Sequence, residues 1–244
     1  MIPYLNNSIS SAMPQKEKIR DMFDGIAPSY DRLNHLLSFN MDKLWRRRSL
    51  KALVDGSAQQ ILDVACGTGD STIAIAAAAG PGTRVTGVDI SKGMMDLVMR
   101  KAAHEGVHDR IKLQVADGEA LPYPDASFHR VNCAFGIRNF EHREQGLQEF
   151  FRVLKPGGRV VILELSQPDG KVLRGLYNLY FLHLLPWIGG LVSGQRDAYR
   201  YLPASVLAFP GPGAFCRMLR EAGFASIRHR SLTFGLCRMY TGEK

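Results

Sequence analysis

The sequence lacks paired cysteines, a long apolar run and an apolar leader. Its four cysteines form no CxxC pair, which argues against a zinc site and favours a reducing, cytoplasmic location (Cys66, Cys133, Cys216 and Cys237). No run of about 18 uninterrupted apolar residues is present, so we expect no transmembrane helix. The first residues lack a basic start followed by an apolar core, and we therefore expect no signal peptide.

Recognisable sets of catalytic or metal-binding histidines are also missing. The sequence contains seven histidines, namely His35, His104, His108, His129, His142, His183 and His229. We recognise no metal-binding motif among them and no serine–histidine–aspartate set. The chemistry is therefore predicted to use no metal.

Length and composition fit a single globular domain. The chain has 244 residues, of which 45% are apolar, and α/β domains often reach this size. Its 31 basic and 23 acidic residues give a net charge of +8, which favours contact with nucleic acid, acidic lipid or an acidic substrate. The basic residues are scattered apart from clusters at 46–48 and 228–230, which we assign to solvated surface.

The stretch Gln60–Asp70 organises the rest of the chain. Its apolar run at 61–65 is typical of a strand that is buried on both faces. Gly67 and Gly69 then allow a tight turn and the close approach of a ligand. An alanine-rich helix begins at the end of the stretch, and a second strand ends at Asp89, about 20 residues further on. This layout predicts a site for a ligand that carries a ribose.

The glycine turn does not fit a dinucleotide. The dinucleotide fingerprint G-x-G-x-x-G needs a third glycine, and Thr72 stands at that position. Asp63 adds a carboxylate beside the turn, which disfavours a pyrophosphate and suits a ligand with an ammonium group. The spacing of Asp63, Gly67, Gly69 and Asp89 resembles the cofactor site of Rossmann-like S-adenosylmethionine-dependent methyltransferases. A purely structural turn in another α/β protein is the alternative.

Strands and helices alternate after this turn, which predicts a parallel βαβ fold. The further elements that we expect are strands at 111–116, 131–134 and 159–165, helices from Ser91 to 105, at 141–154 and at 210–223, and a final strand pair at 224–231 and 233–241. Before the turn, residues 16–53 are expected to form two or three helices that are interrupted at Pro28. We divide the single domain, 1–244, into a helical cap (16–53), a cofactor-binding core (54–169), a lid or substrate insert (170–209) and C-terminal elements (210–244).

Polar residues gather where the predicted strands end, which is where ligands bind in such sheets. Asp89 is placed to accept both ribose hydroxyls. The backbone of Gly67 and Gly69, with Thr68, would meet the amino-acid tail, and Asp63 would lie near its ammonium group. Two neighbours after the third strand, Asp117 and Gly118, would accept the adenine amino group and leave room for its ring.

The segment 171–193 is too apolar for a surface linker and too short to span a bilayer. Its apolar part, 172–188, would either close over the site as a lid or offer an apolar surface to a lipid or lipid-like substrate. A buried core helix is the third interpretation.

Methyl transfer needs alignment of the nucleophile and exclusion of water. A phenol or hydroquinone ring carbon becomes nucleophilic when the ring hydroxyl loses its proton. Arg138 is a poor base because it stays protonated, but it could stabilise the phenolate or polarise a water that takes the proton. Tyr30 and Asn139 are expected hydrogen-bonding partners, and together with Arg138 they form the predicted catalytic set. Tyr30 as a mere core-edge residue is the alternative.

Several strings of the sequence resemble the ubiquinone/menaquinone biosynthesis C-methyltransferases, a family of the class I S-adenosylmethionine-dependent methyltransferases. The strings lie at 22–34, 62–70, 135–139, 152–158 and 185–203. The Phe-Gly-Ile-Arg-Asn string at 135–139 and the Ser-Gly to Tyr-Leu-Pro string at 193–203 are far more specific than the glycine turn. Some members carry a serine just before the former as a cofactor contact, where this chain has Ala134.

The resemblance implies a Rossmann-like fold with a seven-stranded, mostly parallel sheet, helices on both faces and an antiparallel last strand. It also implies methylation of a polyprenylated quinol ring carbon in menaquinone or ubiquinone biosynthesis, with demethylmenaquinol becoming menaquinol as the first choice and 2-methoxy-6-polyprenyl-1,4-benzoquinol as the alternative substrate. On these grounds Thr68, Asp89, Asp117 and Gly118 contact the cofactor, S-adenosyl-L-methionine.

Such a substrate gives the apolar segment a purpose and favours peripheral contact of a basic, cytoplasmic protein with the inner face of an anionic membrane. A homodimer is a further expectation. An O- or N-methyltransferase acting on a soluble substrate is a rival, although it leaves the apolar segment unexplained. We expect no nucleic acid as partner, since no Asn-Pro-Pro-Tyr-like string, basic–aromatic stripe or appended binding module is present.

Overall fold

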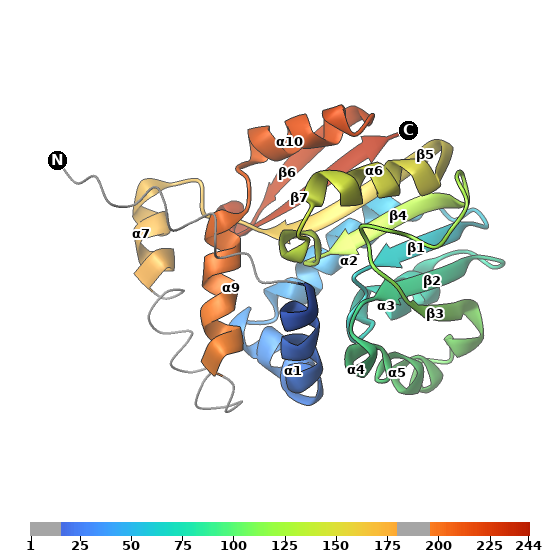
Figure 1. Ribbon diagram of the computed structural model, residues 1–244, viewed down its shortest axis with the longest axis horizontal. Coiled ribbons are helices and arrows are strands. Elements are labelled where there is room, and N and C mark those ends of the chain that lie inside the picture. Colours follow the sequence, from blue (N-terminus) through green and yellow to red (C-terminus); the bar gives the residue numbers. More distant parts are fainter. Residues whose placement is uncertain (1–15, 180–195) are drawn as a thin grey trace.

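The computed structural model describes residues 16–179 and 196–244, and a seven-stranded sheet forms its centre (Figure 1). The strands are β1 (Gln60–Val64), β2 (Arg84–Asp89), β3 (Ile111–Val115), β4 (Phe128–Ala134), β5 (Leu154–Leu165), β6 (Ala225–Leu232) and β7 (Cys237–Glu243). Their order in the sheet is β3-β2-β1-β4-β5-β7-β6. The pairs among β1 to β5 are parallel, and β7 runs antiparallel to β5 and β6. The predicted mostly parallel sheet with an antiparallel last strand is confirmed.

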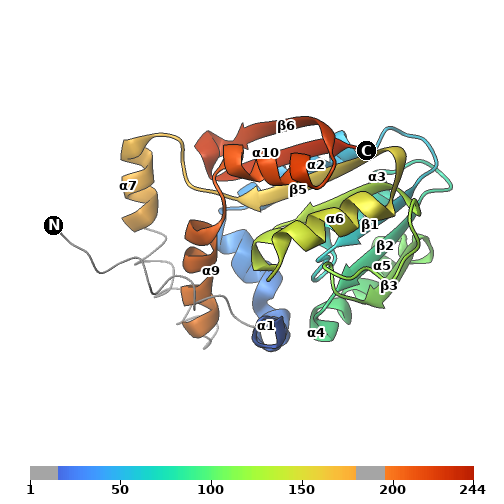
Figure 2. The same ribbon diagram turned by 45° about the horizontal axis from the view of Figure 1, so that its top comes forward.

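Helices cover both faces of this sheet. They are α1 (Lys16–Leu37), α2 (Met41–Leu53), α3 (Asp70–Ala78), α4 (Lys92–Met95), α5 (Val98–His104), α6 (Arg143–Val153), α7 (Lys171–Leu179), α9 (Arg196–Ala208) and α10 (Pro212–Glu221), with 3-10 turns η1 (His108–Arg110), η2 (Ile137–Asn139) and η4 (Thr233–Gly235). Apolar residues of α2, α3 and α5 form one core with the sheet, and those of α6 and α10 form a second core on its other face. Helices α1 and α9 lie beyond the carboxyl ends of the central strands (Figures 1 and 2).

The predicted break of the first helical region at Pro28 is wrong. Helix α1 continues through Pro28, because the buried Ile26, Ala27 and Leu33 on either side hold it against the rest of the fold at the cost of one backbone hydrogen bond. The chain leaves the helix at Phe39 and Asn40, whose φ values of 52° and 59° cannot continue a right-handed helix.

The helix that was predicted from Ser91 to residue 105 is divided into α4 and α5. Ser91 caps α4 as expected, since its Oγ accepts the Met94 N–H at 3.1 Å. The Asp24 carboxylate of α1 accepts the Ser91 hydroxyl at 2.5 Å and the Gly93 N–H at 2.9 Å. These bonds tie α1 to the segment that follows β2.

Strand β5 begins earlier than predicted. Residues 155–158 were expected to separate the preceding helix from a strand at 159–165, but Leu154 already pairs with Phe128 of β4. A bulge between Phe128 and Arg130 absorbs the extra residues, after which the register is regular.

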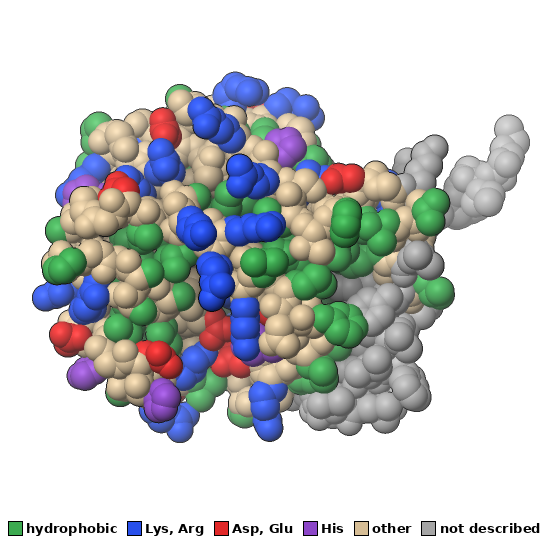
Figure 3. Space-filling view, turned by 180° about the vertical axis from the view of Figure 1, so that it is seen from behind, with side chains coloured by type: hydrophobic (Ala, Val, Ile, Leu, Met, Phe, Trp, Pro, Cys, Tyr) green, Lys and Arg blue, Asp and Glu red, His purple; other side chains and the backbone are tan. Residues whose placement is uncertain are grey.

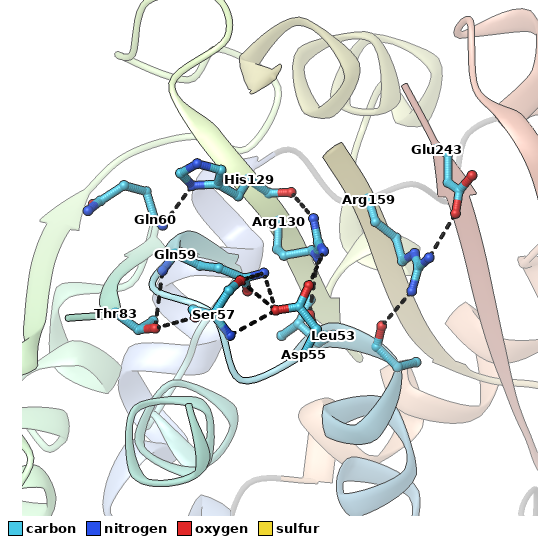
Figure 4. Close-up of polar contacts among 11 residues, drawn as sticks. Leu53, Asp55, Ser57, Gln59, Gln60, Thr83, His129, Arg130, Arg159 and Glu243 are labelled. Carbon is cyan, nitrogen blue, oxygen red and sulfur yellow. Dashed lines mark hydrogen bonds and ion pairs between the residues drawn. The ribbon is translucent and has the colours of Figure 1, made fainter. Parts of the chain in front are cut away.

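Polar groups bond to one another at the amino edge of the sheet (Figure 4). Arg130 donates to the Leu53 carbonyl at 3.2 Å and to Asp55 at 2.8 Å. The Gln60 N–H donates to the His129 ring at 2.9 Å. These groups already have protein partners at the amino edge. Ligands of such sheets bind at the opposite edge, where the parallel strands end. Among the described residues, no helix is both long and apolar enough to cross a membrane.

Candidate functional site

Two adjoining cavities open at the carboxyl edge of the sheet. The first, which we call the turn cavity, is lined by the glycine turn and by the ends of β1, β2 and β3; predicted site residues in its lining are Tyr30, Asp63, Gly67, Thr68, Asp89, Asp117, Gly118 and Asn139. The second, the apolar cavity, lies between α1, α2 and the ends of β4 and β5, and its predicted site residues are Tyr30 and Arg138. Four residues line both cavities, namely Tyr30, Arg46, Asp70 and Phe135. The two cavities are therefore neighbours with a common wall.

The Asp89 carboxylate is held by the backbone on both sides. Its Oδ2 accepts the Gly67 N–H at 2.8 Å, and its Oδ1 accepts the Ser91 N–H at 2.9 Å. Burial raises the pKa of this carboxyl group, while the N–H groups oppose the shift. Each oxygen keeps a lone pair for a further donor, so the geometry fits a pair of ribose hydroxyls.

Asp63 is 1% exposed and already has two partners. Its Oδ2 accepts the Thr72 hydroxyl at 2.6 Å, and its Oδ1 accepts the Asn132 amide at 2.7 Å. Thr72 occupies the position of the third dinucleotide glycine, so the residue that departs from that fingerprint is the one that holds Asp63 in place. Burial raises the pKa of Asp63, and these hydrogen bonds oppose the shift. Its contact with an ammonium group stays a prediction.

Gly69 lies outside the lining of both cavities and shapes the turn instead. Its φ is 88°, and a Cβ at this position would stand 2.6 Å from Val98 Cγ1. The neighbouring Thr68 does line the turn cavity and donates its hydroxyl to Asp31 at 2.5 Å. Lys101 Nζ forms ion pairs with Asp31 at 2.8 Å and with Asp70 at 2.5 Å. The turn is thus anchored to α1 and α5 through a carboxylate pair.

Asp117 and Gly118 lie together in the turn cavity, as the predicted adenine contacts should. Lys16 Nζ donates to Asp117 Oδ2 at 2.6 Å. Gly118 is packed so closely that a Cβ there would lie 2.4 Å from Phe140 Cζ and 2.8 Å from Val64 Cγ1.

The Gly118→Ala variant is expected to lose about 1–3 kcal/mol of unfolding free energy, because the added methyl group must displace Phe140 or Val64 in a packed core. Denaturant unfolding measures this loss. Gly213→Ala is the matched control, since a Cβ there meets no atom within 4 Å. Equal unfolding free energies of the two variants would show that the packing around Gly118 leaves room for a methyl group.

Arg138 lies on η2 and is 4% exposed. Its guanidinium donates to the Phe135 carbonyl and, at 2.9 Å, to Glu164 Oε1. The backbone N–H of Arg138 donates to Glu164 Oε2 at 3.1 Å. Burial opposes the charge of Arg138, but the Glu164 carboxylate outweighs it, and the pKa of Arg138 is raised. The side chain therefore stays cationic beside the apolar cavity.

Tyr30 and Asn139 take different places around this cation. Tyr30 stands in the wall between the two cavities, and burial raises the pKa of its hydroxyl. Asn139 opens onto the turn cavity and accepts the Tyr201 hydroxyl of α9 at 2.9 Å. The structure thus brings Tyr30 and Arg138 to the apolar cavity and Tyr30 and Asn139 to the turn cavity, with Tyr30 common to both.

Assignment of Arg46 to solvated surface is wrong. Arg46 lines both cavities, donates to the Ser71 hydroxyl at 2.5 Å and lies 4.9 Å above the Phe135 ring centre. Helical spacing could have revealed it, since Asp42, Trp45 and Ser49 of the same helix are buried. The other basic cluster is exposed as predicted, at Arg228 and Arg230.

A second group that sequence reasoning missed contains a histidine. His35 Nδ1 lies 2.8 Å from Asp42 Oδ2, and His35 Nε2 lies 3.8 Å from Asp70 Oδ2. Three potential ligand atoms of these residues stand within 4.8 Å of one another. Each carboxylate already has protein donors, from Ser38 to Asp42 and from Lys101 to Asp70. The expectation of a site without metal stays a prediction.

The predicted lid is described in part. Residues 180–195, including most of its apolar run, lie outside the described residues. On either side, α7 and α9 contribute Tyr177 and Leu202 to the apolar cavity, while Val172 and Leu179 of α7 are 82% and 62% exposed. The described residues of the predicted lid therefore form part of the lining of the apolar cavity.

Comparison with known proteins places this arrangement in a family. The model of the ubiE/COQ5 methyltransferase family matches residues 12–244. The chain is 49% identical to the ubiquinone/menaquinone biosynthesis C-methyltransferase UbiE of Geobacter sulfurreducens over 93% of this chain and 89% of that protein. It is 46% identical to the demethylmenaquinone methyltransferase of Deinococcus radiodurans over 93% of each.

A solved structure shows the same fold at much lower identity. Phosphoethanolamine N-methyltransferase 2 of Haemonchus contortus, in complex with S-adenosyl-L-methionine, superposes with a TM-score of 0.59 at 16% identity, over 82% of this chain and 52% of that one. Since identity at this level carries the fold alone, the assignment rests on the family model and on the closely similar relatives. The chain belongs to the ubiE/COQ5 methyltransferase family.

Proposed function

We propose that this protein transfers a methyl group from S-adenosyl-L-methionine to a ring carbon of a polyprenylated quinol, converting demethylmenaquinol to menaquinol. The observation that carries the proposal is the pair of adjoining cavities, one polar and one apolar, with a common wall at Tyr30, Arg46, Asp70 and Phe135. A reaction between a polar cofactor and a lipid-like substrate needs such a pair of compartments. The names of the relatives support the same activity.

The turn cavity would hold the cofactor. Asp89 would accept the ribose hydroxyls, Thr68 and the Gly67 backbone would meet the amino-acid tail, and Asp117 with Gly118 would border the adenine. When bound, S-adenosyl-L-methionine supplies a methyl group on a cationic sulfur. Two carboxylates, Asp63 and Asp89, give the cavity a negative character that suits a cationic ligand.

The apolar cavity would hold the quinol ring and the beginning of its tail. Apart from Tyr30, its apolar and aromatic lining comes from nine side chains on several elements, namely Leu37, Phe39, Met41, Trp45, Phe135, Leu165, Tyr177, Leu202 and Leu236. Arg138 and Tyr30 are the polar groups through which this wall would orient a ring oxygen. Since Arg138 is a fixed, buried cation, it would stabilise the negative charge that develops on that oxygen.

Product analysis tests the proposal. The protein is incubated with labelled S-adenosyl-L-methionine and, separately, with demethylmenaquinol and 2-methoxy-6-polyprenyl-1,4-benzoquinol. We expect labelled menaquinol from the first. Label in the second alone would move the activity to the ubiquinone branch, the alternative that the name of the Geobacter relative includes. Label in neither, from a protein that binds the cofactor, would contradict the proposal.

We further propose that the protein docks on the inner face of an anionic membrane. Lys and Arg side chains form a stripe across the face that Figure 3 shows. Helix α2 has four exposed basic residues, Lys43, Arg47, Arg48 and Lys51, and β6 has two, Arg228 and Arg230. Phe39, which is 71% exposed, precedes α2 in the chain. Phe234, which is 78% exposed, follows Thr233, whose hydroxyl accepts the Trp45 ring N–H of α2 at 2.8 Å. Basic side chains can bind anionic headgroups, and the neighbouring apolar side chains can enter the acyl-chain region. This combination suits a lipid surface.

The Arg47→Glu/Arg48→Glu variant is expected to bind vesicles that contain phosphatidylserine at least about 30-fold more weakly, since each basic residue near the surface contributes about 1 kcal/mol. Co-sedimentation at low salt measures the binding. Arg84→Glu/Lys112→Glu is the control, because it changes the net charge equally at exposed positions on β2 and β3. Equal loss in both variants would show that only net charge matters. The predicted homodimer and the domain boundaries stay predictions.

A further inference from the structure

We infer that His35 and Asp42 form the proton-accepting pair of the site, which takes up the proton that the ring hydroxyl of the substrate releases. The inference rests on the proposed function, because that reaction releases one proton and needs an acceptor. It gives a role to a histidine that belongs to no recognisable sequence motif.

The pair has the geometry of a histidine that is oriented by a carboxylate. Asp42 Oδ2 lies 2.8 Å from His35 Nδ1, and Asp42 Oδ1 accepts the Ser38 hydroxyl at 2.7 Å. Asp42 is only 5% exposed, and these two hydrogen bonds hold its carboxylate in place. A carboxylate at Nδ1 keeps the proton on that nitrogen and leaves Nε2 with a free lone pair.

The free nitrogen points toward the shared wall of the two cavities. His35 Nε2 lies 3.8 Å from Asp70 Oδ2, a separation that a small movement of either side chain would close to a hydrogen bond. Asp70 lines both cavities, and Ser38 and Asp42 line the apolar one. A proton released in the apolar cavity therefore has a short polar route to Nε2.

Charged groups from four helices surround the pair. Asp42 of α2 and Asp70 of α3 flank the ring on two sides. The cations Arg46 of α2 and Lys101 of α5 lie beyond Asp70, and Lys101 is also paired with Asp31 of α1. Burial opposes the charge of Asp70, but Arg46, Lys101 and His35 outweigh it and lower its pKa, so Asp70 passes a proton on rather than keeping it.

The other polar residues of the apolar cavity are poor acceptors. Arg138 is held as a cation by Glu164. The Tyr30 hydroxyl carries a proton, and its burial makes loss of that proton harder. Asp42 and Asp70 also line this cavity, but each already accepts a protein donor, from Ser38 and from Lys101. His35 Nε2, which lies next to Asp70 behind the lining, is therefore the acceptor that we infer.

The step balances as follows. The O–H bond of the ring hydroxyl breaks with its electron pair left on oxygen, and a new N–H bond forms at His35 Nε2. The ring carbon then forms a C–C bond to the methyl group, whose bond to sulfur breaks with the electron pair left on sulfur. The C–H bond of that ring carbon breaks with its electron pair returned to the ring and its proton passed to solvent water, and His35 returns its proton to the ring oxygen. One proton is released in total, to solvent.

A ring hydroxyl probe tests the pair without any methyl donor. 4-Nitrophenol, whose hydroxyl is about as acidic as an imidazolium, is titrated by absorbance in the presence of wild-type protein, His35→Gln and Asp42→Asn. We expect the bound nitrophenol to ionise about one pH unit lower with the wild type than with either variant, since a base of matched pKa takes up the released proton and forms an ion pair with the phenolate. The control is His108→Gln, which removes an exposed histidine of η1, next to β3. It is expected to behave as the wild type.

Turnover supplies the second readout. His35→Gln is expected to lower kcat by about 100-fold with little change in KM. His35→Ala should regain turnover with added imidazole. Wild-type nitrophenol titration and wild-type turnover in His35→Gln would overturn the inference. If the wild type ionises nitrophenol but methylates no quinol, the proposed function fails and the proton-accepting pair stands.

Discussion

Replacing Arg138 with glutamine is expected to lower the free energy of unfolding by about 3–5 kcal/mol, because it leaves the Glu164 carboxylate buried without its counter-ion. Glu164 is 0% exposed and its two oxygens bond the guanidinium and the N–H of Arg138. Denaturant unfolding monitored by circular dichroism measures the loss. A loss under about 1 kcal/mol would mean that water reaches Glu164.

The Arg138→Gln/Glu164→Gln double variant separates stability from catalysis. Two neutral amides of similar shape can replace the ion pair, so most of the lost stability should return. Turnover should not return, and we expect kcat to stay about 100-fold or more below wild type, because the cation that faces the ring oxygen is gone. A stable double variant with wild-type kcat would remove Arg138 from the proposed chemistry.

Asp89→Asn is expected to raise the Kd for S-adenosyl-L-methionine at least about 100-fold. The asparagine oxygen can accept only one of the two N–H groups that Asp89 now accepts, and its NH2 group faces the other. Loss of a charged acceptor costs about 1.5–3 kcal/mol per hydrogen bond. In this variant the glycine turn loses one such hydrogen bond and the bound ribose would lose another. Isothermal titration calorimetry measures the affinity.

Asp96→Asn is the control for this variant. Asp96 forms an exposed pair with Lys92 at 2.7 Å just beyond the same segment, and its replacement should leave the Kd unchanged. If Asp89→Asn binds the cofactor as tightly as this control, the ribose lies elsewhere and the assignment of the turn cavity is wrong.

The core of the fold and the place of the site could be predicted because both follow from local patterns. Apolar runs that end in glycine or a carboxylate specify parallel strands and their shared edge, and Asp63, Asp89 and Asp117 all lie there. The break of the first helical region could not be placed in this way. Tertiary burial carries α1 through Pro28, whereas the left-handed pair at Phe39 and Asn40 leaves no clear mark in the sequence.

The missed residues share a physical reason. Arg46 belongs to a run of three arginines, and only the packing of α2 on the sheet decides which one turns inward. His35 and Asp42 lie on different helices, and their pairing depends on the turn between α1 and α2. Thr72 reads as a departure from a glycine motif until its bond to Asp63 is seen. Contacts made across elements, rather than residue types, carry this information.

The position of the transferred methyl group tests the central claim most directly. The protein is incubated with S-adenosyl-L-methionine that carries a CD3 group and with demethylmenaquinol, and the product is examined by mass spectrometry and NMR. We predict a CD3 group on the ring carbon and two free ring hydroxyls. A CD3 group on oxygen, or no transfer by a folded protein that binds the cofactor, would contradict the assignment of the apolar cavity to a quinol ring carbon.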